Sequence, residues 1–378
     1  MAGNIIYIGR YLLPRECRSA GAKRMVNQAT YLRKKFDLLI ITFSSLRSGL
    51  PFCKDFYIPK KNKVLYSFVL PFYWLYIFFI LLKRRRNDRK NYLVLETCSD
   101  FFTIIPIFFA KLLGYKVIHD VLEDFLLLQE ELSFKQKLHQ QLKKVFHKCV
   151  KYYADGFIVI SDRLYTKYKK LNVPIIKLYN SIEPAEINTN RRSNAVFTFY
   201  YSGTFTTKDG VIDLINAFNI VEKKFPATRL VLVGKGHFSS FRQCLSLIKN
   251  NKKIEYLGFL PEDRMFNELS NSNLCCITRI NSEYANNGFP FKLAEYSSFG
   301  KPILSTDVSD IATLFTNKKD ILLAEPGNPE SISHLMEYAI KNQDEMMQIG
   351  ENGKIICNRH FSIEYIGEKL GDFFSQLS

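Results

Sequence analysis

Two ionisable residues, Lys292 and Glu295, lie three positions apart in the stretch NGFPFKLAEYSSFGKPILSTD (287–307). Pro290 suits the first position of a helix and Gly300 the position just past its last turn, which predicts a helix of about two and a half turns. Lys292 then lies in the first turn, where the helix dipole disfavours a cation unless an anion is bound. Glu295 is on nearly the same face and could accept hydrogen bonds from a diol such as ribose, or pair with Lys292 within the helix.

A second stretch with potential chemistry is SGTFTTKDG (202–210), in which a strand turns at Gly203 and Lys208 precedes a helix that opens near Gly210. Backbone N–H groups and a helix dipole at such a turn attract phosphate. The glycine spacing is not that of a Walker loop, so a solvated loop lysine is an equal alternative. The next strand ends in VGKG, where Gly234 either lets the backbone approach a ligand or only turns the chain.

Short apolar runs alternate with amphipathic stretches in both halves, which is typical of parallel sheets covered by helices. We expect two doubly wound α/β domains, joined by a polar linker at 181–195, with a cleft between them as the default site. The predicted strands are NIIYIG, DLLIITF, YLVLET, YKVIHD and GFIVIS in the first half, and FTFYYSG, RLVLVG, KIEYLG, LCCITR and KPILSTD in the second.

The composition, at 378 residues and 47% hydrophobic, allows two buried cores. The N-terminal stretch lacks the pattern of a signal peptide, which predicts a cytoplasmic location. None of the eight cysteines has CxxC spacing or a histidine at metal-ligand distance, so we interpret them as buried thiols and expect no metal site. They are Cys17, Cys53, Cys98, Cys149, Cys244, Cys275, Cys276 and Cys357.

Positive charge is concentrated in the N-terminal half. Residues 1–180 carry 32 Lys and Arg against 13 Asp and Glu (32 − 13 = +19), whereas residues 181–378 carry 21 against 23 (21 − 23 = −2). Such asymmetry indicates an anionic partner for the first half, either membrane lipid or nucleic acid, or a basic solvated surface. The aromatic platforms interleaved with basic residues that bind single-stranded nucleic acid are missing, so we expect no nucleic acid partner.

The apolar stretch VLYSFVLPFYWLYIFFILL (64–82) has three interpretations. Its length would allow it to span a bilayer, but Pro71 interrupts it and strands of one predicted sheet flank it on both sides. The alternatives are a buried core helix or a helix lying on a membrane face, with the basic run that follows it at lipid phosphates. The predicted membrane-contact residues are Trp74, Lys83, Arg84, Arg85 and Arg86.

In order and spacing, these motifs resemble family-4 retaining glycosyltransferases (glycosyl transferases group 1) of the bacterial polysaccharide-assembly type. The resemblance includes Gly9 after the first strand, the HD of VIHD, LYNSIE (178–183), YLGFL and Gly-Phe-Pro-x-Lys-x-x-Glu-Tyr. It implies the GT-B fold, with two Rossmann-like parallel-sheet domains facing a central cleft. The implied division is 1–185 for the acceptor, 186–360 for the nucleotide sugar, and 361–378 as a helix packing back on the first domain.

The resemblance also implies roles for individual residues. Glu295 would hold the donor ribose, Lys208 and the amides of Gly288 to Phe291 the diphosphate, Phe259 and Leu260 the nucleobase, and His119 would lie at the transferred sugar. The catalytic set is His119, Lys208, Glu295 and Asn287. The donor-binding set is Gly9, Gly203, Thr204, Lys208, Gly234, Phe259, Leu260, Arg279, Gly288, Phe289, Pro290, Phe291, Lys292 and Glu295.

Two positions depart from the family pattern. Thr204 stands where the family usually has an arginine, so we expect Lys292 or Arg279 to supply the missing charge. Asn287 stands where the family has the first of two glutamates, and an amide can bind a sugar hydroxyl but cannot act as an acid, a base or an anion.

The reaction implied by the resemblance is transfer of a sugar, with retention of configuration, from a UDP- or GDP-linked donor to a glycan or polyprenyl-diphosphate-linked acceptor in cell-surface polysaccharide synthesis. Basic side chains and helix-end amides would stabilise the leaving diphosphate without an obligatory metal or other cofactor. We expect peripheral contact with the inner membrane face. The alternatives are a nucleotide-sugar epimerase of GT-B fold, which would need acid–base carboxylates, and a catalytically silent membrane-associated scaffold.

Overall fold

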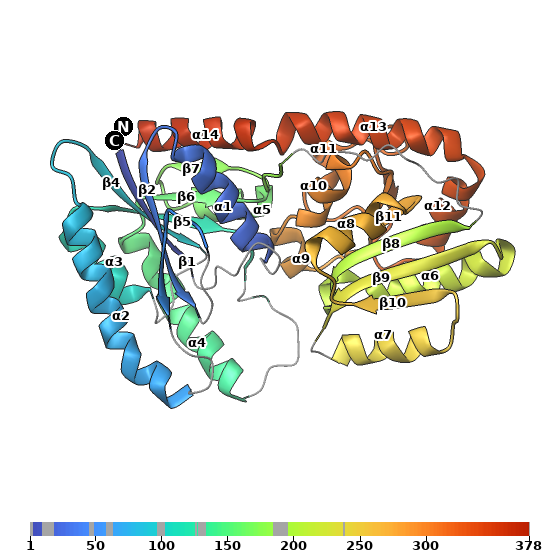
Figure 1. Cartoon of the computed structure of the whole chain (residues 1–378), viewed down its shortest axis with the longest axis horizontal. Helices are drawn as coiled ribbons and strands as arrows, with labels where there is room; N and C mark the ends of the chain where they lie inside the picture. Colours follow the sequence, from blue (N-terminus) through green and yellow to red (C-terminus); the bar gives the residue numbers. More distant parts are fainter. Residues whose placement is uncertain are drawn as a thin grey trace. The chain divides into compact units, whose positions relative to one another are not determined.

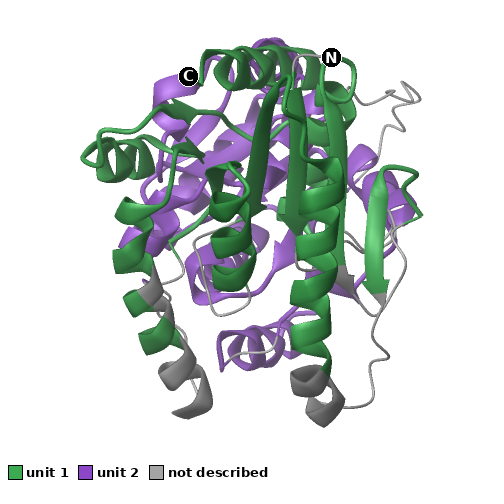
Figure 2. Ribbon diagram, turned by 90° about the vertical axis from the view of Figure 1, so that its left-hand side faces the viewer, with its two compact units in different colours: residues 1–126, 132–181, 363–378 green, residues 127–131, 182–362 purple. Residues whose placement is uncertain are grey.

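The computed structural model of the protein describes residues 3–9, 19–44, 49–57, 63–96, 103–124, 127, 134–183, 196–236 and 239–377. The chain divides into two compact units, coloured in Figure 2: unit 1 comprises residues 1–126, 132–181 and 363–378, and unit 2 comprises residues 127–131 and 182–362. Most of the predicted linker, from 184 to 195, lies outside the described residues. The predicted boundary at 185/186, Cys17 and Cys98 lie outside them as well.

Unit 1 contains a seven-stranded parallel sheet with the order β3-β2-β1-β4-β5-β6-β7 (Figure 1). The strands are β1 (Gly3–Gly9), β2 (Asp37–Ser44), β3 (Cys53–Tyr57), β4 (Lys90–Glu96), β5 (Lys116–Val121), β6 (Gly156–Val159) and β7 (Ile175–Lys177).

Side chains of β1 alternate between two apolar clusters, one on each face of this sheet. Ile5 and Tyr7 belong to the cluster under helices α1 and α14, and Ile6 and Ile8 to the cluster under α2 and α3. A strand buried on both faces needs apolar residues at successive positions, which explains its continuous apolar sequence. The helices of unit 1 are α1 (Ala20–Leu32), α2 (Lys63–Arg84), α3 (Ile104–Leu112), α4 (Phe134–Cys149), α5 (Asp162–Lys169) and α14 (Ile363–Gln376).

Unit 2 contains a six-stranded parallel sheet with the order β10-β9-β8-β11-β12-β13. The strands are β8 (Phe197–Thr204), β9 (Thr228–Lys235), β10 (Ile254–Gly258), β11 (Leu274–Ile277), β12 (Ile303–Thr306) and β13 (Leu322–Ala324). The helices are α6 (Val211–Lys224), α7 (Ser239–Lys249), α8 (Glu262–Ser270), α9 (Glu283–Asn287), α10 (Phe291–Ser298), α11 (Ile311–Leu314), α12 (Pro329–Lys341) and α13 (Gln343–His360).

All ten predicted strands are present, so the α/β class with two parallel sheets is confirmed. Strands β3, β7 and β13 were not predicted. They are short, pair at sheet edges, and carry fewer apolar residues in sequence than the central strands. Among the described residues no helix is long and apolar enough to cross a membrane, and the inner face of α2 packs into the core of unit 1.

A buried ion pair connects three segments of unit 1. The Arg24 guanidinium on α1 donates to the Asp120 carboxylate of β5 at 3.0 to 3.3 Å and to the Leu178 carbonyl at 3.0 Å. Both charged side chains are buried. A buried charge that loses its partner is strongly destabilising.

Replacing Arg24 by Met should therefore lower the free energy of unfolding by about 3–5 kcal/mol, because Asp120 would keep a buried, uncompensated charge. Adding Asp120→Asn should recover part of the loss. Urea denaturation of the wild type and the two variants measures both effects. An R24M variant within about 0.5 kcal/mol of the wild type would contradict the assignment.

Candidate functional site

The predicted site residues of unit 2 gather where its strand order reverses. Strand β8 pairs with β9 on one side and with β11 on the other. At the carboxyl ends of these strands, the loops that follow β8 and β11 therefore leave in opposite directions. Such a switch point is the usual ligand site of an open parallel sheet. Gly203 and Thr204 end β8 here, and Thr278 and Arg279 follow β11.

Two close backbone approaches shape this edge, and both require glycine. A Cβ atom on Gly234 would lie 1.8 Å from the Gly203 carbonyl oxygen on the neighbouring strand, and Gly234 has φ +133°. Gly210, with φ +61°, lies against the end of β11, where a Cβ atom would be 1.7 Å from the Thr278 carbonyl oxygen. The loop between β8 and α6 can therefore pack directly on β11.

A buried carboxylate, Asp209, organises the loop after β8. Its Oδ2 atom accepts hydrogen bonds from Thr204 Oγ1 at 2.7 Å and from Thr206 Oγ1 at 2.6 Å. Its Oδ1 atom forms an ion pair with Lys292 Nζ at 3.3 Å. The carboxylate was not among the predicted site residues, although it lies next to Lys208 in the sequence.

Lys292 reaches this carboxylate from the first turn of α10. Its Nζ atom also donates to Tyr201 OH at 2.8 Å and lies 4.1 Å from the centre of that ring. Gly203 leaves room for it, since a Cβ atom there would lie 2.5 Å from Lys292 Cε. The sequence assigned Lys292 to a bound phosphate; in the structure the anion that faces it belongs to the chain itself.

The pKa values of the ionisable groups in the site are set by burial and by the three basic side chains that surround the Asp209 carboxylate. Burial raises the pKa of the Asp209 carboxyl, but the positive charges of Lys292, Lys208 and Arg279 outweigh it, so the pKa lies well below the usual range. Burial lowers the pKa of the Lys292 ammonium; Asp209 acts in the opposite direction, and Arg279 and Lys208 lower the pKa further. The basic groups outnumber the carboxylate, so the site favours an additional anion.

Among these basic side chains, Arg279 would be stabilised most by binding such an anion. The residue is 7% exposed, and its Nε and Nη1 atoms have no hydrogen-bond partner within the described parts of the chain. The Thr306 hydroxyl donates to the Arg279 backbone carbonyl at 2.6 Å and so holds the backbone at this position. A buried guanidinium with unused donors is costly, and a bound oxyanion would satisfy it.

Lys208 lies in the short 3-10 turn Thr207–Asp209 at the same edge. Its half-buried side chain places Nζ 4.5 Å from the centre of the Tyr284 ring, and its carbonyl accepts a hydrogen bond from Ile280 N at 3.1 Å. Lys208 and Arg279 thus follow the adjacent strands β8 and β11.

The predicted helix over the Lys-Glu pair is confirmed as α10, with Pro290 as its N-cap and Gly300, at φ +60°, just past its end. Tyr296 fixes it to β8, because its hydroxyl accepts a hydrogen bond from Ser202 N at 2.9 Å. Glu295 and Asn287 are both buried.

The segment that links α9 to α10 is well packed. Gly288, Phe289, Pro290 and Phe291 are buried, and the Phe289 ring lies 5.8 Å from that of Phe361. Asn286, which the sequence did not single out, accepts a hydrogen bond from Ser309 N at 2.9 Å and ties α9 to the loop after β12.

The predicted nucleobase contacts lie at the end of β10, on the same sheet edge. Gly258 turns the chain at φ +67°, and Phe259 is then 54% exposed with Lys235 Nζ 4.9 Å from its ring centre. Leu260 is half-buried. An exposed aromatic ring at a strand end offers a stacking surface.

His119 and Gly9 belong to unit 1. The His119 ring is fully buried on β5, where it stacks on Phe157 at 5.7 Å and lies at the same distance from the Tyr153 ring. Gly9 ends β1, and a Cβ atom there would lie 2.7 Å from Met25 Cε. These contacts place both residues in the interior of unit 1, and their roles toward a ligand stay predictions. Within the described residues no group of three or more His, Cys, Asp and Glu side chains could hold a metal ion.

Comparison with known proteins identifies the part of the chain that carries this site. The profile of the family described as "Glycosyl transferases group 1" matches residues 184–355. This match covers less than half of the chain. The matched region includes Asp209, Arg279, Asn287 and Glu295.

A curated glycosyltransferase is similar to part of the chain. The chain is 26% identical over 170 residues to the uncharacterized glycosyltransferase MJ1178 of Methanocaldococcus jannaschii, and the match covers 45% of this chain and 44% of that protein. The chain thus spans less than half of the relative's length.

Two solved structures share the fold of this chain. Anabaena HepE in complex with UDP and glucose has a TM-score of 0.73 at 14% identity, covering 99% of this chain and 100% of the other. Sucrose-phosphate synthase from Thermosynechococcus elongatus has a TM-score of 0.74 at 14% identity, covering 99% of each chain. The predicted GT-B fold class is confirmed.

Replacing Asp209 by Asn should lower the free energy of unfolding by about 3–5 kcal/mol at neutral pH, because Lys292 would lose its buried counter-charge. The pKa of Asp209 lies below that of an unfolded aspartate, so the difference from wild type is full at neutral pH and shrinks as the pH falls below about 4. Urea denaturation across this pH range measures the effect.

Asp307→Asn is the matched control, because that carboxylate is exposed at the end of β12. Equal stability of D209N and D307N at pH 7 would contradict the role of Asp209. Adding Lys292→Met to D209N should recover part of the loss, since it removes the stranded charge.

Proposed function

We propose that the protein is a retaining glycosyltransferase that moves a sugar from a nucleoside-diphosphate sugar to a glycan or lipid-linked acceptor in cell-surface polysaccharide synthesis. The observation that carries the proposal is the buried, unsatisfied guanidinium of Arg279 beside Lys208, at the switch point of a glycosyltransferase domain. This arrangement suits the diphosphate of such a donor.

The diphosphate would be held by Arg279 and Lys208. Arg279 lies on a different strand from Thr204, the position where the family usually has its arginine, so the charge would be supplied from the end of β11 in place of β8. Lys292 would act through Asp209, keeping that carboxylate ionised and turned away from the ligand. As the sugar leaves, fixed cations in a partly dry site stabilise the developing charge on the departing diphosphate.

The remaining donor contacts follow from position. Glu295, one turn into α10, would accept hydrogen bonds from the ribose hydroxyls, and the backbone amides at the start of α10 would add donors toward phosphate. Phe259 and Leu260 would contact the nucleobase. We favour a UDP-linked sugar, because the solved structure of HepE that shares the fold contains UDP and glucose.

Asn287 would bind a hydroxyl of the transferred sugar without proton transfer, since an amide neither gains nor loses a proton in the accessible range. The alternative function as an epimerase is less favoured, because it needs acid–base carboxylates and Asp209 is already engaged by two hydroxyls and Lys292. The predicted independence from metal and the predicted cytoplasmic, membrane-peripheral location stay predictions.

Arg279→Ala should weaken UDP binding about tenfold to a hundredfold, because one charge-assisted contact to phosphate is worth roughly 1.5–3 kcal/mol. Isothermal titration calorimetry measures the change. Without ligand the variant should be as stable as wild type or more so, since a buried charge with unused donors is removed.

Arg229→Ala is the control for this experiment. Arg229 lies near the start of β9, at the opposite edge of the same sheet, and pairs with Glu255 at 3.4 Å. Unchanged UDP affinity in R279A, or an equal loss in R229A, would overturn the assignment of the diphosphate site.

Glu295→Gln should reduce donor turnover and UDP affinity together, because a neutral amide replaces the carboxylate that would bind the ribose hydroxyls. We expect a loss of about tenfold in affinity, measured by the shift of the thermal unfolding temperature with UDP concentration. Glu330→Gln, at an exposed position on α12, serves as the control. A variant E295Q that hydrolyses and binds the donor like wild type would refute the ribose contact.

A further inference from the structure

Helices α2 and α3 of unit 1 expose an unusual number of large apolar side chains. On α2 the exposed positions recur at intervals of three, four and three residues, which places them on one face. Phe79 is 63% exposed and Phe108 on α3 is 62% exposed. We define the α2–α3 surface by its six exposed apolar residues, which are Phe72, Leu75, Phe79, Leu82, Phe108 and Leu112.

This surface is separate from the face of α2 that the fold needs. The inner face of α2 packs on the sheet through Tyr73, Ile77 and Leu81, all of which are fully buried. The rings of Phe78 and Phe109 lie 4.9 Å apart and join α2 to α3, so the outer faces of the two helices adjoin (Figure 1). Exposed apolar patches of this kind mark interaction sites.

A dense basic segment follows the surface at the end of α2. Residues 83–90 (KRRRNDRK) contain six Lys and Arg and one Asp, a net charge of +5 (6 − 1). Lys83 lies one helical turn after Phe79, and both Lys83 and Arg85 are exposed. Among the described residues no carboxylate lies within ion-pair distance of either side chain, so their charges face outward.

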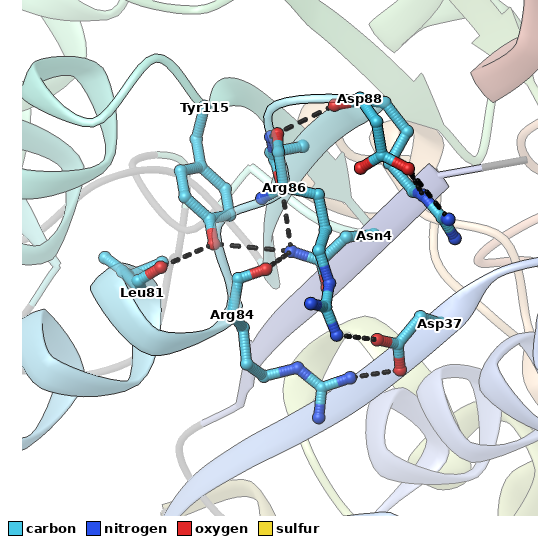
Figure 3. A network of polar contacts seen from close by, with 9 residues as sticks. Asn4, Asp37, Leu81, Arg84, Arg86, Asp88 and Tyr115 are labelled. Atoms are coloured by element: carbon cyan, nitrogen blue, oxygen red, sulfur yellow. Dashed lines mark hydrogen bonds and ion pairs between the residues drawn. The ribbon is translucent and has the colours of Figure 1, made fainter.

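A polar network fixes this segment to the sheet (Figure 3). Asn4 donates to the Arg84 carbonyl at 3.0 Å, and Tyr115 OH donates to the Leu81 carbonyl at 2.8 Å. The Arg84 side chain forms an ion pair with Asp37, and Arg86 lies 4.0 Å from the same carboxylate. The end of α2 is thus held rigidly and presents the basic segment beside the apolar surface.

The structure changes which residues can meet a membrane. Of the residues predicted from the sequence, Trp74 packs partly against the core, and Arg84 and Arg86 both face the Asp37 carboxylate. We therefore do not place these three at the centre of the surface. Lys83 and Arg85 keep their predicted position, and Phe72, Phe79 and their apolar neighbours replace Trp74.

We propose that the α2–α3 surface lies in the headgroup region of an anionic lipid bilayer, with Lys83 and Arg85 at lipid phosphates. The six apolar side chains would enter the acyl boundary, and the basic segment would add electrostatic attraction. A second copy of the chain fits the surface less well, because a symmetric contact would bring two strongly basic units together. The inference deepens the proposed function, on which it rests for the lipid-linked acceptor.

Flotation with phosphatidylcholine vesicles, with and without phosphatidylglycerol, tests the inference on the full chain. The wild type should bind the anionic vesicles, and Phe79→Ser with Phe108→Ser should weaken binding at least about tenfold. Lys83→Glu with Arg85→Glu should do the same and remove the preference for anionic lipid, because each basic residue near the surface contributes roughly fivefold. Ile355→Ser, 56% exposed on α13, and Lys223→Glu, exposed on α6, are the matched controls.

The outcomes separate the possibilities. Wild-type binding that none of the α2–α3 variants reduces, or that the controls reduce equally, would overturn the inference. The inference would also be overturned if the wild type did not bind vesicles but self-associated in sedimentation velocity, and if replacing Phe79 and Phe108 abolished this self-association. That result would identify a second copy of the chain as the partner. UDP affinity, measured in parallel, should not change in these variants. Vesicle binding without any UDP binding would instead count against the proposed function alone.

Discussion

The buried carboxylate of Asp209 is the group on which the site of unit 2 depends. It accepts hydrogen bonds from two threonine hydroxyls of the loop after β8 and pairs with Lys292 of α10. One carboxylate therefore connects the end of a strand to the first turn of a helix, where Lys292 lies 83 residues later in the sequence. Its partner would otherwise be an ammonium at the positive end of a helix. The ion pair resolves that conflict inside the protein, and in the proposed function Arg279 and Lys208 would bind the external anion in place of Lys292.

The ion pair between Asp209 and Lys292 also determines which basic residues of the site face the proposed ligand. Lys292 is paired with Asp209, and Lys208 lies against an aromatic ring. Among the residues that the structure describes, nothing accepts a hydrogen bond from Nε or Nη1 of the buried Arg279. A planar guanidinium with fixed donors suits two phosphate oxygens better than a flexible ammonium does. The proposed anion site therefore does not need an arginine at the position of Thr204, because Arg279 after β11 would supply the same charge.

Much of the fold could be predicted from the sequence, because strands buried on both faces are continuous apolar runs and α10 is bounded by Pro290 and Gly300. The short edge strands β3, β7 and β13 lack that signal. Asp209 was missed because a carboxylate in a polar loop resembles a solvated turn, and its ion pair with Lys292 depends on tertiary packing between distant segments. The adjacency of Asp209 and Lys208 in a glycine-bounded loop was the one local signal that could have revealed it.

The long separation of Asp209 from Lys292 also has a consequence for biosynthesis. A nascent chain that has emerged only as far as β9 contains Lys208 and Asp209 but neither Arg279 nor Lys292, so the proposed anion site is incomplete. Non-local contacts of this kind form late, after the entropy of closing the intervening loop has been overcome. The proposed anion site is thus completed at one step, when α10 docks on β8, and a chain that binds an anion there is one whose second sheet has already assembled.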